Sequence, residues 1–198
     1  KLTFKARNGT EYKLSLDLHA FVIFMLGSML RPTRNEIFAL KHGDISILQD
    51  ELSPDYEYLE FVVNRKNKKM KVQTLQTCVF ALNSIRKRRP DYQSDDYVFL
   101  PEYPNRQTAV NMMGLMFRNL LDEINMTADE YGNRFTPYSL RHSAIVFNLN
   151  QPNADRNDIA KRADTSFEMI DKFYYPQVPQ TEKLRQYQRI ILEEDSKT

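Results

Sequence analysis

The chain has 198 residues, of which 41% are hydrophobic and 27% are charged, and its formal net charge is +2. These values are typical of one soluble globular domain, or one domain with a small appendage, that can bury a substantial core. No signal peptide is visible, and the longest apolar run, residues 20–26, is shorter than the ~20 residues of a membrane-spanning helix. The single cysteine, Cys78, cannot form an internal disulfide, which favours a reducing compartment. Because the first residue is Lys1, we expect a piece of a longer protein.

Positive charge is concentrated in one stretch of the chain. Residues 61–90 contain nine Lys or Arg and no Asp or Glu, so the remainder sums to −7. A basic segment on a slightly acidic body predicts a face that binds a polyanion. The alternative is an ordinary solvated positive surface.

The first half of the chain predicts two helices and a small sheet. Apolar residues recur every three or four positions over 14–30, which predicts a buried helix, and 35–42 predicts a second, short helix. Residues 1–13 predict a strand or loop with a turn at Asn8 and Gly9. β-branched and aromatic residues predict antiparallel strands over 44–48, 58–64 and 70–75, with a cation-rich β-turn at 65–69.

Helical patterns dominate the second half. Helices are predicted over 77–89, 107–124, 139–149, 154–162, 166–174 and 181–194, with a loop over 91–104 that contains a short strand, YVFL. The Met- and Leu-rich stripe of 107–124 predicts core positions rather than a cofactor site. The predicted class is mainly α with a small antiparallel β-sheet (α+β).

Four residues suggest phosphodiester chemistry, which needs a nucleophile, cations on the non-bridging oxygens and an acid for the leaving oxygen. Tyr174 is a candidate nucleophile, because a phenol attacks only where cations stabilise the developing charge. Arg31 and Arg141 offer rigid donor forks for a phosphate. Lys66, at the tip of a turn, could reach into DNA as the acid.

Each of these residues also has a purely structural interpretation. Arg31 could cap a helix end, and Lys66 could be one more solvated turn lysine. Arg141 could pair with an acidic neighbour. Tyr174 could be a core aromatic residue. Taken singly, none of them identifies an enzyme.

Taken in order, the segments around these residues resemble the catalytic domain of the tyrosine recombinases (phage integrase family). LRPTRNEIFALKHGDI is similar to the block of the first arginine, with Arg31 as that arginine, Glu36 as the acidic residue after it and Arg34 as the alternative arginine. NRKNKK resembles a turn between two strands of the family, which puts Lys66 at the catalytic lysine. The likeness covers about residues 14–178.

Two further blocks complete the resemblance. YSLRHS resembles the H-x-L-R-H block, so Arg141 takes the place of the second arginine and His142 that of a supporting residue. ADTSFEMIDKFY resembles the closing block, with Tyr174 as the nucleophile. Tyr138 stands where the family usually has histidine, and Thr165 stands where histidine or tryptophan is common.

The resemblance implies DNA breaking and rejoining without a metal or a cofactor. Tyr174 would form a 3′-phosphotyrosyl link while Lys66 protonates the leaving 5′-oxygen. Four residues would hold the phosphate, namely Arg31, Arg141, Tyr138 and Thr165. Three residues of the basic turn would contact DNA, namely Arg65, Lys68 and Lys69. The three histidines and Cys78 show no metal-ligand spacing.

The resemblance also implies partners and an organisation. The partners are double-stranded DNA attachment sites, further protomers of a homotetramer and accessory DNA-bending proteins, and we expect a cytoplasmic, DNA-associated protein of bacterial or phage type with no membrane contact. Residues 1–13 would be the end of a linker, 14–180 the catalytic domain and 181–198 a C-terminal helix and tail. An apolar stripe of that helix would dock on a neighbouring protomer or pack on its own domain. Any N-terminal DNA-clamping domain is expected to be missing, which would make this the catalytic fragment.

Two other functions stay open. A degenerate recombinase would be a non-catalytic DNA-binding module, and the departures at Tyr138 and Thr165 favour it. A nicking-closing enzyme similar to type IB topoisomerases would share the same residues but relax supercoiled DNA without a specific site.

Overall fold

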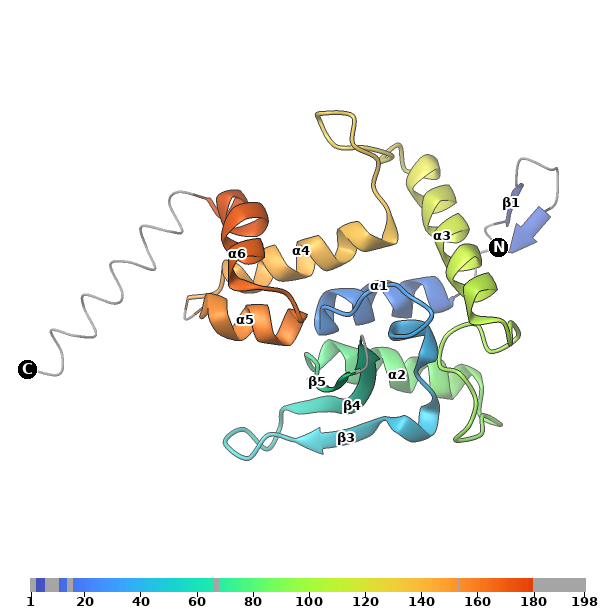
Figure 1. Cartoon of the computed structure of the whole chain (residues 1–198). Helices are drawn as coiled ribbons and strands as arrows, with labels where there is room; N and C mark the ends of the chain where they lie inside the picture. Colours follow the sequence, from blue (N-terminus) through green and yellow to red (C-terminus); the bar gives the residue numbers. More distant parts are fainter. Residues whose placement is uncertain (1–2, 6–10, 14–15, 66–67, 153, 180–198) are drawn as a thin grey trace, which may run out of the picture. The chain divides into compact units, whose positions relative to one another are not determined.

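The structure, a computed structural model, describes residues 3–5, 11–13, 16–65, 68–152 and 154–179 and divides into two compact units. The first unit is Lys1–Arg141 and the second is His142–Thr198. All the strands seen in the described residues belong to the first unit, which combines them with helices (Figure 1). The coarse prediction of a mixed α+β protein with a small antiparallel sheet is therefore confirmed.

The sheet of the first unit has three antiparallel strands in the order β3-β4-β5. The strands are β3 (Ser46–Gln49), β4 (Glu57–Arg65) and β5 (Lys68–Gln73). Along β4, the buried positions Leu59, Phe61, Val63 and Arg65 alternate with positions that are more accessible. This is the two-residue period of a strand with one face on a core, and it assigns Arg65 to the inner face. A separate pair of short strands, β1 (Thr3–Lys5) and β2 (Glu11–Lys13), is also antiparallel.

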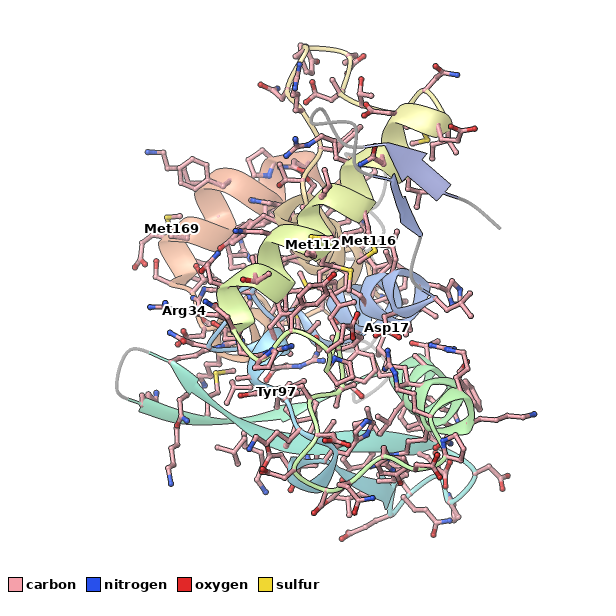
Figure 2. All side chains as sticks on the ribbon, turned by 90° about the vertical axis from the view of Figure 1, so that its right-hand side faces the viewer. Asp17, Arg34, Tyr97, Met112, Met116 and Met169 are labelled. Carbon is pink, nitrogen blue, oxygen red and sulfur yellow. The ribbon has the colours of Figure 1, made fainter. Side chains whose placement is uncertain are left out.

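Helices α1 (Asp17–Ser28), α2 (Thr77–Arg88) and α3 (Arg106–Glu123) lie in the first unit, and α2 packs between α1 and the sheet. α1 packs on α2, and α2 packs on β4 (Figure 1). α3 carries Met112 and Met116 along its length, and Met116 is buried (Figure 2). The core joins these elements through fully buried phenylalanine rings, of which Phe24 and Phe99 meet edge to face at 5.1 Å.

Buried charges fix the irregular segments of the first unit. The carboxylate of Asp17 accepts hydrogen bonds from Arg89 at 2.6 Å and from the backbone N–H of Leu100 at 3.1 Å. The guanidinium of Arg106 donates to four backbone carbonyl groups, those of Phe38, Phe99, Leu100 and Tyr103. A guanidinium has five donors in a fixed fork, so one side chain can satisfy several buried carbonyl groups.

The second unit is built from short helices. α4 (Pro137–Leu149) begins in the first unit and continues into the second. α5 (Arg156–Ala163) follows, and then α6 (Phe167–Met169), a π-helical turn (Ile170–Tyr174) and a 3-10 turn (Tyr175–Gln177). Small and branched apolar residues form its core, namely Ala144, Ile145, Leu149, Ile159, Ala160, Ala163, Ile170 and Val178.

The predicted helix over 35–42 is wrong, and its hydrogen bonds explain why. Two separate 3-10 turns (Ile37–Ala39 and His42–Asp44) replace it, with Leu40 extended between them. The carbonyl oxygen of Leu40 accepts from the N–H of Val98 at 2.9 Å, and that of Phe38 accepts from Arg106. Since these carbonyl groups are satisfied by a distant part of the chain, the segment does not need the ladder of an α-helix.

The remaining predicted elements differ in smaller ways. The short strand predicted at YVFL is only an isolated bridge between Tyr97 and Lys41. The helix predicted over 166–174 is split into α6 and the π-helical turn. The turn at Asn8 and Gly9 and the helix over 181–194 lie outside the described residues.

Within the part of the chain that the structure describes, no helix has the length and apolar character needed to cross a bilayer.

Candidate functional site

Arg31 and Arg65 share one buried carboxylate in the first unit. Glu36 accepts hydrogen bonds from the backbone N–H of Arg31 at 3.0 Å and from its Nη1 at 2.9 Å. The other guanidinium comes from the end of β4, where Arg65 Nη2 lies 2.8 Å from Glu36 Oε2. The side chains of Glu36 and Arg65 are 4% and 2% exposed, whereas that of Arg31 is 22% exposed. Of the two arginines, Arg31 is therefore the one that solvent, or an anion, can reach.

Arg141 is anchored two residues before Arg31. Its Nη1 donates a hydrogen bond to the backbone carbonyl oxygen of Met29, across 112 positions of the sequence. Met29 ends α1 in the left-handed conformation, with φ of 54° and ψ of 23°, and the chain turns there into the segment that carries Arg31. The two predicted arginines are thus tied to the same short turn. We call Arg31, Glu36, Arg65 and Arg141 the arginine cluster.

Arg65, which was expected to contact DNA, lies on the inner face of the sheet. Its side chain is buried, is paired with Glu36, and has Nη1 3.1 Å from the Sδ of Met70. The physical reason is the alternation of β4, which turns every second side chain inward up to the end of the strand. This alternation was visible in the sequence and is the signal that could have predicted the inward position.

The other cations of the hairpin differ from Arg65 in their exposure. Lys68 and Lys69, at the start of β5, are exposed, which agrees with a surface that could meet a polyanion. Lys71 is also exposed and pairs with Glu60 at 2.9 Å, an interaction that lowers the pKa of that carboxyl group. Lys66, the predicted acid, lies outside the described residues.

Most of the cations at the end of α2 serve the fold. Arg86 donates to the carbonyl oxygen of His42 at 3.0 Å, Arg88 donates to Ser84 Oγ at 2.7 Å, and Arg89 pairs with Asp17. Arg86 and Arg88 also lie in the last turn of α2, and Arg89 directly follows it, where positive charge complements the helix dipole. The basic stretch of 61–90 therefore has two parts, and the hairpin is the better candidate for a DNA-binding surface.

Two further predicted positions in the first unit lie on its surface. Tyr138 is 40% exposed and stands one helical turn before Arg141 in α4. The start of α4 is fixed by Pro137 at its first position and by Ser139 Oγ, which accepts from the N–H of Thr136 at 3.0 Å. Arg34, the alternative to Arg31, is exposed. Figure 2 shows Arg34 away from Asp17, the buried carboxylate that pairs with Arg89.

In the second unit, Tyr174 stacks on His142. The two ring centroids are 5.0 Å apart with 23° between the ring planes, and Tyr174 is 6% exposed. Tyr174 ends the π-helical turn, a departure from regular helix that is frequent at functional sites. Its burial also agrees with the structural interpretation of a core aromatic residue.

Thr165 lies where α5 ends. Asp164 has a left-handed φ of 49°, a conformation that Asp tolerates better than most residues, and it reverses the chain direction after α5. The N–H of Thr165 donates to the carbonyl oxygen of Ala160 at 2.9 Å. The next residue, Ser166, caps α6 by accepting from the N–H of Met169 at 3.2 Å. Thr165 is thus half-buried in a fixed turn at the entrance to the tyrosine segment, which we define as residues 166–175.

A cation that the sequence interpretation missed holds the tyrosine segment. Arg156 pairs with Asp171 at 2.6 Å and lies over the rings of Tyr175, at 4.5 Å, and Phe167, at 5.2 Å. Charge alone could not have identified it, because Arg156 and Asp171 are fifteen positions apart on different elements.

Comparison with protein-family models and with curated protein sequences finds no match for this chain. In the described ranges, no group of three or more His, Cys, Asp or Glu side chains is arranged to hold a metal ion.

Proposed function

We propose that this chain is the catalytic part of a site-specific DNA recombinase of the tyrosine type. It would cut one strand of double-stranded DNA through a phosphotyrosyl intermediate and rejoin it to a new partner. Tyr174 is the proposed nucleophile, and Arg31 and Arg141 are the proposed ligands of the scissile phosphate. Assembly as a homotetramer on two attachment sites belongs to the same proposal.

One observation carries the proposal most strongly. The hydrogen bond from Arg141 to Met29 ties the second arginine to the turn that holds the first, although the two lie in different parts of the sequence. Two guanidinium groups tied to one turn are suited to a phosphate, because each offers a planar fork of donors. Arg31 is partly exposed, whereas Arg141 is 2% exposed and, like Tyr174, would have to be uncovered when DNA binds. The exposed Lys68 and Lys69 supply positive charge for the neighbouring DNA backbone.

In each step of the proposed reaction, one bond to phosphorus forms as another one breaks. The phenolate of Tyr174 attacks phosphorus, the bond from phosphorus to the 5′-oxygen breaks, and Lys66 gives that oxygen its proton. The arginines stabilise the negative charge that builds on the non-bridging oxygens. A 5′-hydroxyl group from another strand then attacks the phosphotyrosine and returns its proton to Lys66, while the bond from phosphorus to the Tyr174 oxygen breaks and releases Tyr174. The energy of the broken bond is retained in the intermediate, so the reaction needs no nucleotide cofactor.

The proposal makes a demand on Tyr174. Its hydroxyl group must reach a phosphate bound by the arginine cluster, whereas the ring is 6% exposed and stacked on His142. DNA binding would therefore have to expose the tyrosine segment. This segment consists of short pieces of different helical type, namely α6, the π-helical turn and the start of the 3-10 turn, and such irregular pieces are suited to a local rearrangement.

The burial of Tyr174 also favours a second candidate, a DNA-binding module without catalysis. In that case Tyr174 is a core residue, and the arginine cluster and the hairpin bind DNA without cutting it. The two candidates differ in one property, the covalent bond between protein and DNA.

The test is to incubate the full-length parent protein with a nicked suicide version of its attachment site and to look for a covalent adduct by denaturing electrophoresis. We expect an adduct with the unaltered protein and with Tyr175→Phe, and none with Tyr174→Phe. Tyr175 is the matched control because it is the neighbouring tyrosine of the same segment.

Three results would contradict the proposal. An adduct that survives in Tyr174→Phe would mean that another residue is the nucleophile. Specific DNA binding without any adduct would favour the non-catalytic module. Relaxation of supercoiled DNA without a specific site would instead indicate an enzyme of the topoisomerase kind.

A further inference from the structure

The arginine cluster contains a charge that works against phosphate binding. Glu36 is buried, and both of its oxygens face Arg31, one toward Nη1 and the other toward the backbone N–H. A carboxylate at this distance is a direct competitor for the guanidinium donors that a phosphate would use. If Glu36 had Arg31 as its only cationic partner, the pair would be neutral and its attraction for an anion would be weak.

Arg65 changes this balance. Its Nη2 lies 2.8 Å from Glu36 Oε2, the same oxygen that accepts from the N–H of Arg31, and its side chain is only 2% exposed. Glu36 together with the two arginines therefore carries one net positive charge. Because Arg65 and Glu36 are both buried, their interaction is screened little by solvent or salt. The positive charge that remains accessible is on Arg31, with 22% of its side chain exposed.

We propose that Arg65 is a positioning residue, which neutralises Glu36 and so leaves the guanidinium of Arg31 available to a DNA phosphate. This inference rests on the proposed role of Arg31 as a phosphate ligand. It assigns Arg65 a part that differs from direct DNA contact. Glu36 holds Arg31 in place through two hydrogen bonds, and Arg65 offsets the electrostatic cost of that carboxylate.

The test measures binding of the full chain to a short DNA duplex of arbitrary sequence over a range of salt concentrations. Each phosphate contact contributes about 0.9 to the slope of log K against log salt, so Arg31→Met should lower that slope by about this amount. Arg65→Met should have nearly the same effect, because the uncompensated Glu36 then occupies Arg31. In the double variant Arg65→Met/Glu36→Gln, the slope should return toward its original value.

Lys71 provides the matched control. Like Arg65, it is a cation of the β4–β5 hairpin paired with a glutamate, but its partner is Glu60 and its side chain is 64% exposed. We expect Glu36→Gln to strengthen DNA binding at least about fivefold more in the Arg65→Met background than in the Lys71→Met background. Equal gains in the two backgrounds would overturn the inference. A slope that is lowered in Arg65→Met and not restored by Glu36→Gln would identify Arg65 as a direct DNA ligand, which would also overturn it.

A second variant covers the case in which Arg65→Met does not fold, as judged by circular dichroism. Arg65→Lys keeps the positive charge beside Glu36, so it should bind DNA with the slope of the unaltered chain. A folded Arg65→Lys protein that loses the Arg31-dependent part of the slope would overturn the inference.

The salt dependence of DNA binding can be measured without catalysis, so this test is separate from that of the proposed reaction. If DNA binding depends on Arg31 as expected but no covalent adduct forms, only the proposed reaction fails. If the unaltered chain shows no Arg31-dependent DNA binding, the positioning role of Arg65 fails.

Discussion

The imidazole of His142 and the phenol of Tyr174 stack face to face, with their centroids 5.0 Å apart. This contact joins the second residue of the RH pair in α4 to the last residue of the π-helical turn. Stacked rings of this kind contribute about 0.5–1.5 kcal/mol beyond the area that they bury. The stack therefore both stabilises the second unit and limits the access of reagents to the Tyr174 hydroxyl group.

The first prediction concerns this access. In the DNA-free protein, tetranitromethane should nitrate Tyr174 much more slowly than Tyr131, because Tyr174 is 6% and Tyr131 is 82% exposed. His142→Ala removes the stacked ring and should raise the nitration rate of Tyr174 while that of Tyr131 stays the same. The same substitution should lower the free energy of unfolding by about 1 kcal/mol. Mass spectrometry of tryptic peptides measures both rates in one sample, so Tyr131 is an internal control. Equal rates for the two tyrosines in the unaltered protein would show that the stack does not protect Tyr174.

The second prediction is a loss of stability in weak acid that depends on His42. Burial, followed by the nearby charges of Arg86 and Arg89, lowers the pKa of His42 from 6.5 to about 4. Above pH 6.5 His42 is neutral in both the folded and the unfolded protein, so it has no effect there. As the pH falls from 6.5 to 4, the unfolded chain binds the proton first, and the free energy of unfolding decreases. A shift from 6.5 to about 4 corresponds to about 3 kcal/mol, at 1.36 kcal/mol per pH unit.

Urea denaturation at a series of pH values measures this loss. His42→Gln removes the titrating group, so its stability should fall less than that of the unaltered chain between pH 6.5 and 4. His19→Gln is the control, because His19 is exposed. If the three proteins lose stability in parallel over this range, the titration of His42 is not the cause.

The third prediction concerns the contact between α1 and α2. A Cβ atom at Gly27 would meet the Sγ of Cys78 well inside van der Waals contact. Both residues are buried, so Gly27→Ala should lower the free energy of unfolding by about 1–3 kcal/mol. Adding Cys78→Ala removes the sulfur atom and should recover most of this loss. Gly114→Ala in α3 is the control, because a Cβ there meets nothing within 4 Å and should stabilise the helix by about 0.5–1 kcal/mol. Thermal unfolding of the unaltered chain, Gly27→Ala, Cys78→Ala, the double variant and Gly114→Ala measures these changes. Additive effects of Gly27→Ala and Cys78→Ala would contradict the predicted clash.

Periodic patterns predicted the long elements well. The predicted helices over 77–89 and 107–124 correspond to Thr77–Arg88 and Arg106–Glu123, and the three predicted strands correspond to β3, β4 and β5. These elements have one face on the core, so their apolar residues follow the geometry of the backbone. The segment around Phe38 and Leu40 was predicted incorrectly because its carbonyl groups bond to Arg106 and Val98 instead of forming a helix. No local pattern reports such distant partners.

The candidate site shows the same distinction. Arg31 and Arg141 could be selected as phosphate ligands from their residue type, but their common anchor is the backbone carbonyl group of Met29, which no side-chain pattern marks. Arg65 was predicted to contact DNA together with the lysines of the basic turn, whereas the alternation of β4 takes it to the inner face beside Glu36. Charge composition describes what a segment can bind, and strand geometry decides which of its charges can reach a ligand.

Arg106 has a consequence for how freely the neighbouring chain can vary. Its guanidinium is bound to carbonyl oxygens of the backbone, the one acceptor that every amino acid carries. Substitutions at Tyr103 or Leu100 would leave those acceptors in place, whereas replacing Arg106 would remove one donor from all four of them at once. The sensitivity of this irregular segment to mutation is thus concentrated at Arg106, while the neighbouring positions can vary.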